Sequence, residues 1–509
     1  MYKLKLIGAI TRNLILLGVV LGWSPFLKTS AHSQLTPAFD STQVCPPDLP
    51  AAPAHIEHAS IVAGDLAFED VFSLGKMWFD AALNTCDGQG RPATTGTGEK
   101  RVADEPRFLR TSGADSSSCF GCHAQPRSGG GGDFVANVFV LAQGLDPVTE
   151  SVSSEFSNER NTLGMFGAGP IEMVAREMSR SLQAQAAALP DGEHTLVSKG
   201  VEFPISISSG KVVAAHGVDT DLVVKPFHQA GVVVSLRQFT VNAFNHHHGI
   251  QAEERFDLNP AHLDTDFDED GIHREMTLGD VTAVTLFQAA LATPTQKLPW
   301  TEKARAPIAE AEKLFGEIGC AGCHTPAMEL DSPYFVEPNP FNPDGTFGDT
   351  SQTVSFDMTK EGQLPRLPIA SSGKAVVKAY TDLKRHNLCD PADTPDAIRF
   401  FCNEEFDQDR PEQDGRPGAE FFLTRKLWDV GNSAPYGHRG DVTTISEAIY
   451  YHAGEARLSR DSFVALPMEK QVMIVEFLKT LKVDDVPFDC NGDGKMDSLD
   501  LVGIGCFTK

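Results

Sequence analysis

Two short segments of the sequence share the pattern Cys-x-x-Cys-His, and this repeat constrains the chain more than any other feature. The segments are Cys119-Phe-Gly-Cys122-His123 and Cys320-Ala-Gly-Cys323-His324. Two thiols on one helical turn can form thioethers with the two vinyl groups of a porphyrin, and the next histidine can turn its imidazole under the iron. The pattern predicts two covalently bound haem c groups, with His123 and His324 as proximal ligands.

Zinc sites and redox dithiols also use Cys-x-x-Cys pairs. A zinc ribbon separates its two pairs by about 15–20 residues, whereas roughly two hundred residues separate these. A redox dithiol does not need a histidine after the second cysteine, and here one follows both times. Haem attachment is therefore the preferred reading of both segments.

Residues 1–31 have the composition of an export signal. Basic side chains precede an apolar run from Leu14 to Trp23, and small residues would place a cleavage after Ala31. The run is shorter than the roughly 20 residues that a membrane span needs, so a cleaved signal is the preferred interpretation. An uncleaved anchor is the alternative. We expect a periplasmic or secreted protein that meets a membrane only if the signal stays.

The other six of the ten cysteines agree with export, because disulfides persist in oxidising compartments. They form three local pairs, although the connectivity is not fixed by sequence. The pairs are Cys45 with Cys86, Cys389 with Cys402, and Cys490 with Cys506. After this pairing no reactive thiol is left over, so a thiol substrate has no support.

The formal net charge of −26 bears on partners. A negative field of this size repels nucleic acid and anionic membrane surfaces, and it attracts basic proteins. It also promotes solubility. We expect a small redox protein, such as a soluble cytochrome c or a copper protein, as partner and no nucleic acid.

A chain of 509 residues is too long for one ordinary core. Helical spacing of apolar residues is clearest in Gly279–Leu291, which Thr277 would cap, and in Ile308–Ile318 and Glu469–Leu481. In each half, a helix near the haem segment should pack on the terminal helix. We predict a mainly α fold with two cytochrome c-like domains.

The expected domains follow from these patterns. An N-terminal haem domain spans 45–296 and carries a small strand insertion at about 192–226, where apolar and polar residues alternate. Pro294 and Pro299 mark a linker, and a C-terminal haem domain spans 301–483. The glycine run 129–132 reads as a flexible turn beside the first haem.

The tail at 487–509 fits a calcium-binding loop. Oxygen ligands recur at the spacing of an EF-hand loop, with Gly494 at its sharp turn. The ligand positions are Asp489, Asn491, Asp493, Lys495 (through its carbonyl), Asp497 and Asp500. The loop resembles half of a dockerin repeat, and the alternative is an acidic disordered tail. Asp266, Asp268 and Asp270 form a second calcium-like loop.

Further stretches resemble a known family. They are Asn158–Met173, Ser235–Phe256, Thr381–Asn387, Leu427–Ile449 and Gly454–Leu466. With the first haem segment they resemble the bacterial di-haem oxidoreductases of the thiol oxidoreductase type, which are relatives of di-haem cytochrome c peroxidases and MauG. The resemblance covers most of residues 60–482.

The resemblance implies roles for single residues. Pro170-Ile-Glu172-Met173 is similar to a peroxidase segment whose acid serves the distal side of the N-terminal haem, where peroxide cleavage needs general acid–base help. A solvated or capping Glu172 is the alternative. His248 stands where many relatives have a Met, which makes it a distal ligand candidate for this haem.

The C-terminal haem departs from the peroxidase pattern. Relatives supply a Met ligand ahead of the Pro-Tyr-x-His-x-Gly loop, but the stretch here reads Phe-Phe-Leu-Thr-Arg-Lys. This departure raises His386 as the substitute, with His438 and His452 also open. Trp300 is a hypothetical relay between the haems, or a packing residue.

The sequence thus predicts a di-haem c-type cytochrome with electron transfer and oxidoreductase activity. The C-terminal haem would receive electrons and the N-terminal haem would offer the substrate site. The alternatives are a peroxidase that reduces hydrogen peroxide and a pure relay with both haems six-coordinate. A haem closed by His on both sides would be a poor peroxide site unless one ligand leaves on reduction.

Overall fold

The computed structural model describes residues 49–89, 116–132, 135–138, 158–256, 272–299, 301–402, 418 and 420–483. All of them belong to one compact unit within Ser41–Lys509. Several predicted features lie outside the described residues: the signal at 1–31, Cys45, the calcium-like loop with Asp266, Asp268 and Asp270, Trp300, and the tail with both its calcium ligands and Cys490 and Cys506.

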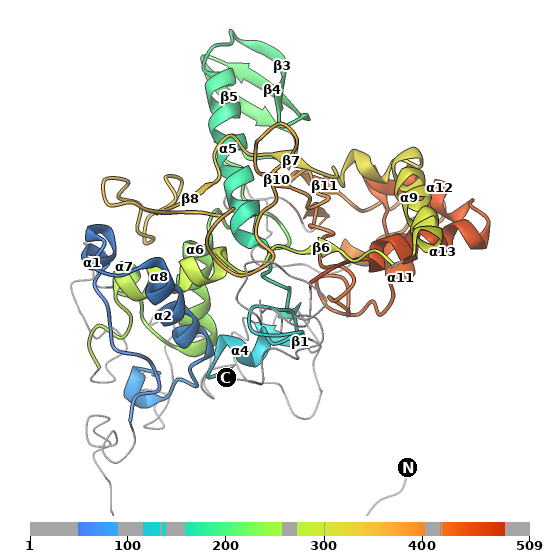
Figure 1. Ribbon diagram of the computed structural model, residues 1–509. Helices are drawn as coiled ribbons and strands as arrows, with labels where there is room; N and C mark the ends of the chain where they lie inside the picture. Colours follow the sequence, from blue (N-terminus) through green and yellow to red (C-terminus); the bar gives the residue numbers. More distant parts are fainter. Residues whose placement is uncertain are drawn as a thin grey trace, which may run out of the picture. The chain divides into compact units, whose positions relative to one another are not determined.

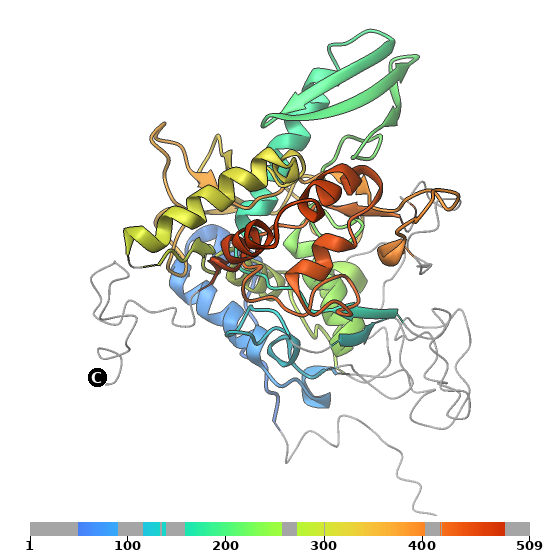
Figure 2. The ribbon, with the colours of Figure 1, turned by 90° about the vertical axis from the view of Figure 1, so that its right-hand side faces the viewer.

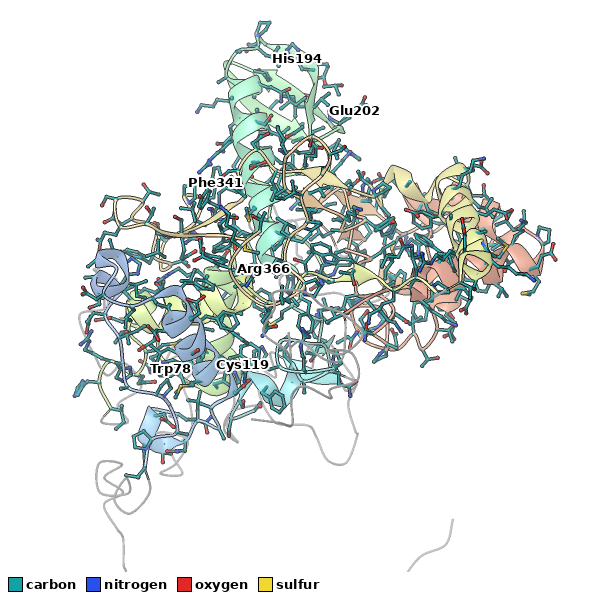
Figure 3. The ribbon with its side chains drawn as sticks, viewed as in Figure 1. Trp78, Cys119, His194, Glu202, Phe341 and Arg366 are labelled. Atoms are coloured by element: carbon teal, nitrogen blue, oxygen red, sulfur yellow. A yellow bond between two sulfur atoms is a disulfide. The ribbon has the colours of Figure 1, made fainter. Side chains whose placement is uncertain are left out.

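The first group of helices surrounds the first cysteine segment. Helix α2 (Phe68–Asp80) packs on α8 (Leu278–Ala289), and α4 (Cys119–Cys122) contacts α2 (Figures 1 and 3). The expected capping box of Thr277 and Asp280 opens α8 and is confirmed. Because α8 has no charged residue after Asp280, it is buried on all sides.

The second group repeats this arrangement. Helix α9 (Glu302–Glu317) leads into the second cysteine segment and packs on α13 (Met468–Lys479), side by side in Figures 1 and 2. Phe315 of α9 and Phe477 of α13 stand 5.7 Å apart between ring centroids. The predicted helices at 279–291, 308–318 and 469–481 are confirmed, as is their pairing beside each cysteine segment.

Helix α5 (Ala168–Ala186) leads into the predicted strand insertion. Strands β3 (Gly192–Ser198), β4 (Val201–Ser208) and β5 (Lys211–Ala215) form an antiparallel meander that projects with α5 in Figure 1, and Figure 3 labels His194 and Glu202 on it. Both hairpins turn on two residues with positive φ, of which the second is glycine, a geometry that matches the strand twist. Alternating burial along β4 agrees with the predicted strands, which end at Ala215 rather than near residue 226.

The base of the meander reaches the C-terminal half. Lys384 donates its Nζ to the carbonyl of Glu202 at 2.8 Å and lies over the Phe203 ring at 5.4 Å. The backbone N–H of Arg385 donates to the carbonyl of Gly217 at 3.0 Å, and its side chain pairs with Asp219. Lys384 lies 182 residues after Glu202, so the insertion is anchored to a segment far along the chain.

The remaining elements are short. The other helices are α1 (His58–Ala63), η2 (Thr85–Asp87), α6 (Leu236–Ala243), the π-helix η3 (Phe244–His248), α7 (Glu253–Phe256), η4 (Cys320–Gly322), η5 (Phe400–Cys402), α11 (Ile445–Tyr450), η7 (Gly454–Ala456) and α12 (Arg457–Val464). Antiparallel pairs join β1 (Val135–Val138) to β2 (Asn158–Asn161), β6 (Thr295–Gln296) to β13 (Leu481–Lys482), β7 (Met328–Glu329) to β10 (Val376–Val377), β8 (Tyr334–Glu337) to β9 (Val354–Asp357) and β11 (Arg385–Asn387) to β12 (Phe421–Leu423).

The two halves share a hydrophobic core. One cluster contains Val71 and Ile171 of the first half together with Phe335, Phe356 and Trp428 of the second. The predicted boundary at 296–301 therefore lies between two helix pairs whose neighbouring residues belong to one hydrophobic cluster. The division into two separate haem domains stays a prediction. Among the described residues, no helix is both long and apolar enough to cross a membrane.

Candidate functional site

The first cysteine segment forms a single turn of helix. The backbone N–H of His123 donates to the carbonyl of Cys119 at 2.9 Å, which continues the turn past both cysteines. Cys119 and Cys122 are free thiols. Burial raises the pKa of both, that of Cys119 to about 12. A redox dithiol requires a lowered thiol pKa, so this environment favours the attachment reading.

The His123 ring is held by the glycine run that follows it. Its Nδ1 lies 3.1 Å from the carbonyl oxygen of Gly130, and because a carbonyl only accepts, Nδ1 must carry the proton. Burial lowers the pKa of His123 to about 4, so the ring is neutral at pH 7 with Nε2 as its lone-pair nitrogen.

The run 129–132 is close-packed rather than a flexible turn, which corrects our expectation. All four glycines are buried. A Cβ on Gly130 would lie 1.8 Å from the carbonyl oxygen of Gln125, and one on Gly132 would lie 2.6 Å from that of Cys122. The glycines are needed because the chain folds directly back on the cysteine turn.

The second cysteine segment repeats this geometry. His324 donates its backbone N–H to Cys320 at 2.9 Å, and its Nδ1 lies 3.0 Å from the carbonyl oxygen of Tyr380. Burial lowers the pKa of His324 to about 4 and raises that of Cys320 to about 11. The Phe315 ring of α9 stands 6.2 Å from the His324 ring.

The structure brings His248 to the first segment. The π-helix η3 ends at this residue, where Gly249 takes a positive φ of 67°. His248 is 3% exposed; its Nδ1 donates to the carbonyl of Ser116 at 2.6 Å, and its Nε2 lies 3.3 Å from Cys119 Sγ. The ring thus faces the attachment cysteine with the nitrogen that a metal would use.

His386 lies beside the second segment, but as a charged group. Its Nδ1 is 2.8 Å from Glu455 Oε2 and its Nε2 is 2.8 Å from Asp382 Oδ2. Burial by itself would lower the pKa, but hydrogen bonds with Asp382, Cys323 and Glu455 outweigh it and raise the pKa of His386 to about 11. With both nitrogens protonated, the ring has no lone pair to give a metal.

Unlike His386, His452 has only one ring nitrogen in a hydrogen bond to a described residue. Its Nδ1 donates to the carbonyl of Ala448 at 2.6 Å, and burial lowers its pKa. No group among the described residues lies within hydrogen-bond distance of its Nε2. It is near enough to His324 to lower that residue's pKa further, and the Phe401 ring stands 6.2 Å away. His452 was one of several candidates in the sequence, and no pattern there distinguished it from His386.

Glu172 is not solvated, and it does not cap its own helix. Its side chain is 0% exposed on α5, where Oε1 accepts from Arg176 at 2.7 Å and from Asn339 at 2.8 Å. Its Oε2 accepts the backbone N–H of Leu236 at 2.8 Å. Both oxygens are therefore engaged in holding α5, α6 and the segment after β8 together.

A second buried charge lies next to this carboxylate. Arg237 is 0% exposed and donates to Glu254 at 2.8 Å, to Glu337 at 3.1 Å and to Thr282 at 2.8 Å. Burial outweighs the attraction of Arg237 and raises the pKa of Glu337 to about 7. Arg237 and Glu254 come from the first half, whereas Glu337 ends β8 in the second.

Trp428 connects the surroundings of the two cysteine segments. The Arg127 guanidinium lies 4.4 Å from the Phe166 ring centroid, and a Cβ on the adjoining Gly167 would lie 2.1 Å from the Trp428 ring. On the other side, the backbone N–H of Trp428 donates to the carbonyl of Ala379, which precedes Tyr380. Trp428 itself is buried, and Trp300, the relay that the sequence suggested, lies outside the described residues.

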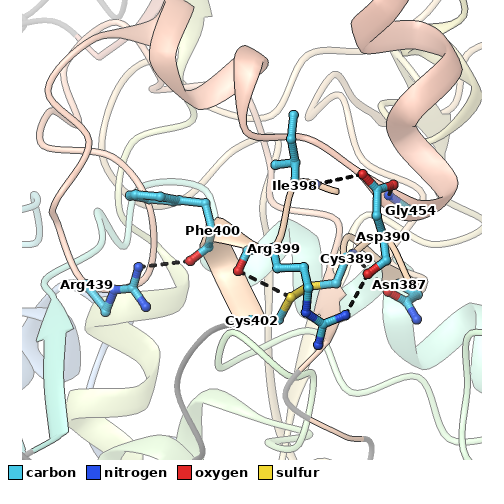
Figure 4. Close-up of a disulfide and its surroundings, with 9 residues drawn as sticks. All are labelled: Asn387, Cys389, Asp390, Ile398, Arg399, Phe400, Cys402, Arg439 and Gly454. Carbon is cyan, nitrogen blue, oxygen red and sulfur yellow. Dashed lines mark hydrogen bonds between the residues drawn. A yellow bond between two sulfur atoms is a disulfide. The ribbon is translucent and has the colours of Figure 1, made fainter. Parts of the chain in front are cut away.

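A disulfide joins Cys389 to Cys402, the local pair that the sequence suggested (Figure 4). Around it, Asp390 accepts the backbone N–H of Ile398 at 2.9 Å and that of Gly454 at 3.1 Å. The bridge thus supports the loop that precedes Glu455, the partner of His386. Cys86 also forms a disulfide, with a partner outside the described residues.

Comparison with known proteins bears on the second half. Residues 350–481 match the family model described as "Di-haem oxidoreductase, putative peroxidase". Over these residues the chain is similar to the di-haem oxidoreductases. The match includes His386, Trp428 and His452, and the predicted relationship is confirmed. No curated protein sequence matches the chain.

Two solved structures were also compared with the chain. The hydrazine synthase of Kuenenia stuttgartiensis, pressurized with 20 bar xenon, is 12% identical with a TM-score of 0.36, and covers 93% of this chain and 100% of its own. A MauG-like protein associated with microbial copper homeostasis is 18% identical with a TM-score of 0.26, and covers 62% of this chain and 87% of its own. At these scores neither likeness supports a conclusion.

Proposed function

We propose that the chain is an exported di-haem c-type cytochrome that moves electrons between a protein donor and a substrate. The observation that supports this proposal most strongly is the repeated geometry of the two cysteine turns. In each, the histidine donates Nδ1–H to a backbone carbonyl, at 3.1 Å for His123 and 3.0 Å for His324, and keeps Nε2 for a metal. The family match supports two haems.

The residues of both turns fit covalently bound haem. Each turn offers two free thiols at the spacing of the porphyrin vinyl groups and a neutral imidazole next to them. Apolar rings back each histidine: Phe79 stands 6.1 Å from His123, and Phe315 stands 6.2 Å from His324. Haem bound there supplies one-electron redox chemistry, and the chain supplies attachment, ligation and cover.

We further propose His248 as the distal ligand of the N-terminal haem and His452 as that of the C-terminal haem. His248 is buried and His452 is half-buried. Both anchor Nδ1 on a backbone carbonyl, so Nε2 is the nitrogen that would bind iron. His386 then serves as the cationic partner of Asp382 and Glu455. The C-terminal haem would receive electrons, and the N-terminal haem would pass them to the substrate.

Reduction of hydrogen peroxide is the second candidate, favoured by the family description. That reaction needs a proton-transfer group beside the substrate. Glu172, the residue expected in this role, has both oxygens engaged by Arg176, Asn339 and Leu236. Electron transfer is therefore our leading proposal.

The sequence supports the setting of this activity. Net charge −26 suits a small basic redox protein as donor, either a soluble cytochrome c or a copper protein. Cysteine usage and the predicted signal support a periplasmic or secreted location. Calcium is proposed for the tail loop and for the loop at 266–270, which lie outside the described residues.

Electron paramagnetic resonance of the oxidised, haem-loaded protein tests the proposal. Wild type should show two low-spin signals. His248→Ala should convert one of them to high spin, His452→Ala the other, and His386→Ala neither. A protein without covalent haem in a pyridine haemochrome assay would overturn the proposal. A high-spin signal in wild type that responds to cyanide or peroxide would favour the peroxidase, and conversion by His386→Ala would return the ligand role to that residue.

A further inference from the structure

Asp429 is a buried acid to which the proposed electron path gives no role. It follows Trp428 in a turn and is 3% exposed. Its φ is 81°, a left-handed conformation that Asp and Asn adopt more readily than most residues. The backbone N–H of Asn432 donates to the carbonyl of Asp429 at 3.0 Å, so the turn fixes where the carboxyl group stands.

The carboxyl group of Asp429 contacts the surroundings of the first cysteine segment. Its Oδ2 lies against Gly164, where an added Cβ would collide with this oxygen. The same Cβ would lie 3.6 Å from the backbone nitrogen of Gly131. Gly131 belongs to the close-packed glycine run that holds the His123 ring. The side chain of Asp429 is thus next to the support of a predicted haem ligand.

The backbone beside Asp429 leads to the second cysteine segment. The N–H of Trp428 donates to the carbonyl of Ala379 at 3.4 Å. The next residue, Tyr380, accepts the Nδ1–H of His324 at 3.0 Å. Asp429 therefore lies between the supports of both predicted proximal histidines, with its side chain on the side of the first.

The surroundings of the carboxyl group keep it close to a change of charge. Two cations face it: Lys426, half-buried and bonded to the carbonyl of Phe166 at 3.0 Å, and Arg127, which lies over the Phe166 ring. Within the described ranges, Oδ1 of Asp429 has no hydrogen-bond partner. Burial raises the pKa of Asp429 to about 6, and the two cations and the backbone N–H of Val483 oppose it only in part.

A unit change of charge nearby in a buried setting alters the proton affinity of a carboxyl group by about tenfold or more. We propose that Asp429 takes up one proton from solvent as an electron reaches the N-terminal haem, so that electron transfer here is coupled to protonation. The electron comes from the protein donor, and the carboxylate becomes a neutral carboxylic acid. The two charges cancel, and no further reactant is needed. This inference rests on the proposed function.

Spectroelectrochemical titration of the haem-loaded full chain, from about pH 5 to about pH 9 to bracket the pKa of Asp429, tests the coupling. Proton uptake on reduction makes the potential of the N-terminal haem fall as the pH rises. The fall begins near pH 6 and ends at the higher pKa of the reduced protein. A tenfold difference in proton affinity between the two redox states gives a total fall of about 59 mV for one electron.

Asp429→Asn removes the acid, keeps the shape of the side chain and tolerates the positive φ. The potential of its N-terminal haem should be independent of pH across this window. It should match wild type at low pH, where Asp429 is neutral, and lie above wild type at high pH. Asp441→Asn is the matched control, because the Asp441 carboxylate is 37% exposed and already paired with Arg439 at 2.8 Å. This control should keep the wild-type curve.

Asp429→Gly guards against an Asn variant that fails to fold, since glycine accepts a φ of 81° without strain, and it should give the same flat curve. Infrared difference spectra, reduced minus oxidised, provide a second measurement. The carbonyl band of a protonated carboxyl group should appear in wild type and be absent from both Asp429 variants. The inference is overturned if these variants keep the wild-type pH dependence, or if the wild-type potential does not change with pH. A chain without covalent haem would instead overturn the proposed function.

Discussion

Replacement of Arg237 by Met should destabilise the protein more than loss of any exposed arginine. Arg237 is buried with Glu254 at 2.8 Å and Glu337 at 3.1 Å, and it also donates to Thr282 and to the carbonyl of Leu278. Methionine fills much of the same volume but offers no charge and no donor. The variant therefore leaves two carboxylates buried without their cation.

The expected loss follows from these contacts. Breaking one buried ion pair by removing a single partner costs about 3–5 kcal/mol, because the other charge stays in a low dielectric. Here two acids lose the same partner, so we expect a loss of at least about 4 kcal/mol in the free energy of unfolding. Part of it would be relieved if Glu337 takes up a proton.

Arg274→Met is the matched control. Arg274 also has two glutamate partners, Glu57 at 3.1 Å and Glu253 at 3.2 Å, but its side chain is 46% exposed. Exposed pairs contribute about 0–1 kcal/mol, so this variant should lose little. Urea unfolding of both haem-loaded variants, followed by far-ultraviolet circular dichroism at pH 5, 6, 7 and 8 (values chosen to bracket the pKa of about 7), gives the comparison.

The pH series tells charge from packing. The folded-state pKa of Glu337, about 7, lies above its ordinary value, so the unfolded chain releases this proton first. Stability therefore falls as pH rises from about 4.5 to about 7 and levels off above. Without Arg237 the folded pKa rises further, so the fall should extend to higher pH. Equal losses in both variants, or a loss in Arg237→Met that does not change with pH, would refute the reasoning.

Three further predictions concern replacements at one or two residues. Gly130→Ala should halve the covalent haem content in a pyridine haemochrome assay, because its Cβ would lie 1.8 Å from the carbonyl oxygen of Gln125 and the turn that holds His123 must shift; full content would contradict this. Trp428→Phe should slow electron transfer between the haems in stopped-flow reduction, and an unchanged rate would leave Trp428 as a packing residue. Replacing Cys389 and Cys402 by Ser should lower the free energy of unfolding by about 3 kcal/mol, measured in urea against wild type under oxidising conditions.

Local features of the fold could be predicted from sequence because their causes are local. Apolar spacing located α8, α9 and α13, and alternation located the meander at 192–215. The paired strands of two to four residues elsewhere were missed because so short a run carries no periodicity. Their positions depend on partners far along the chain, as β6 and β13 illustrate.

The same limit applies to the candidate site. The cysteine turns could be read directly, since attachment needs only neighbours in sequence. The choice between His386 and His452 could not, because it depends on Glu455, 69 residues from His386. The engagement of Glu172 likewise depends on Asn339, 167 residues away. The candidate residues could be named from the sequence, but the choice among them depends on contacts with residues far along the chain.

The anchoring of the β3–β5 meander changes how this chain can be divided or recombined. The meander interrupts the first half by chain order, yet Lys384 and Arg385 of the second half hold its base at Glu202 and Gly217. A chimera that exchanged only the first half between relatives would separate the insertion from its own anchor. The insertion and the 381–387 segment should therefore be inherited together, as one exchangeable piece that the linear order of the chain conceals.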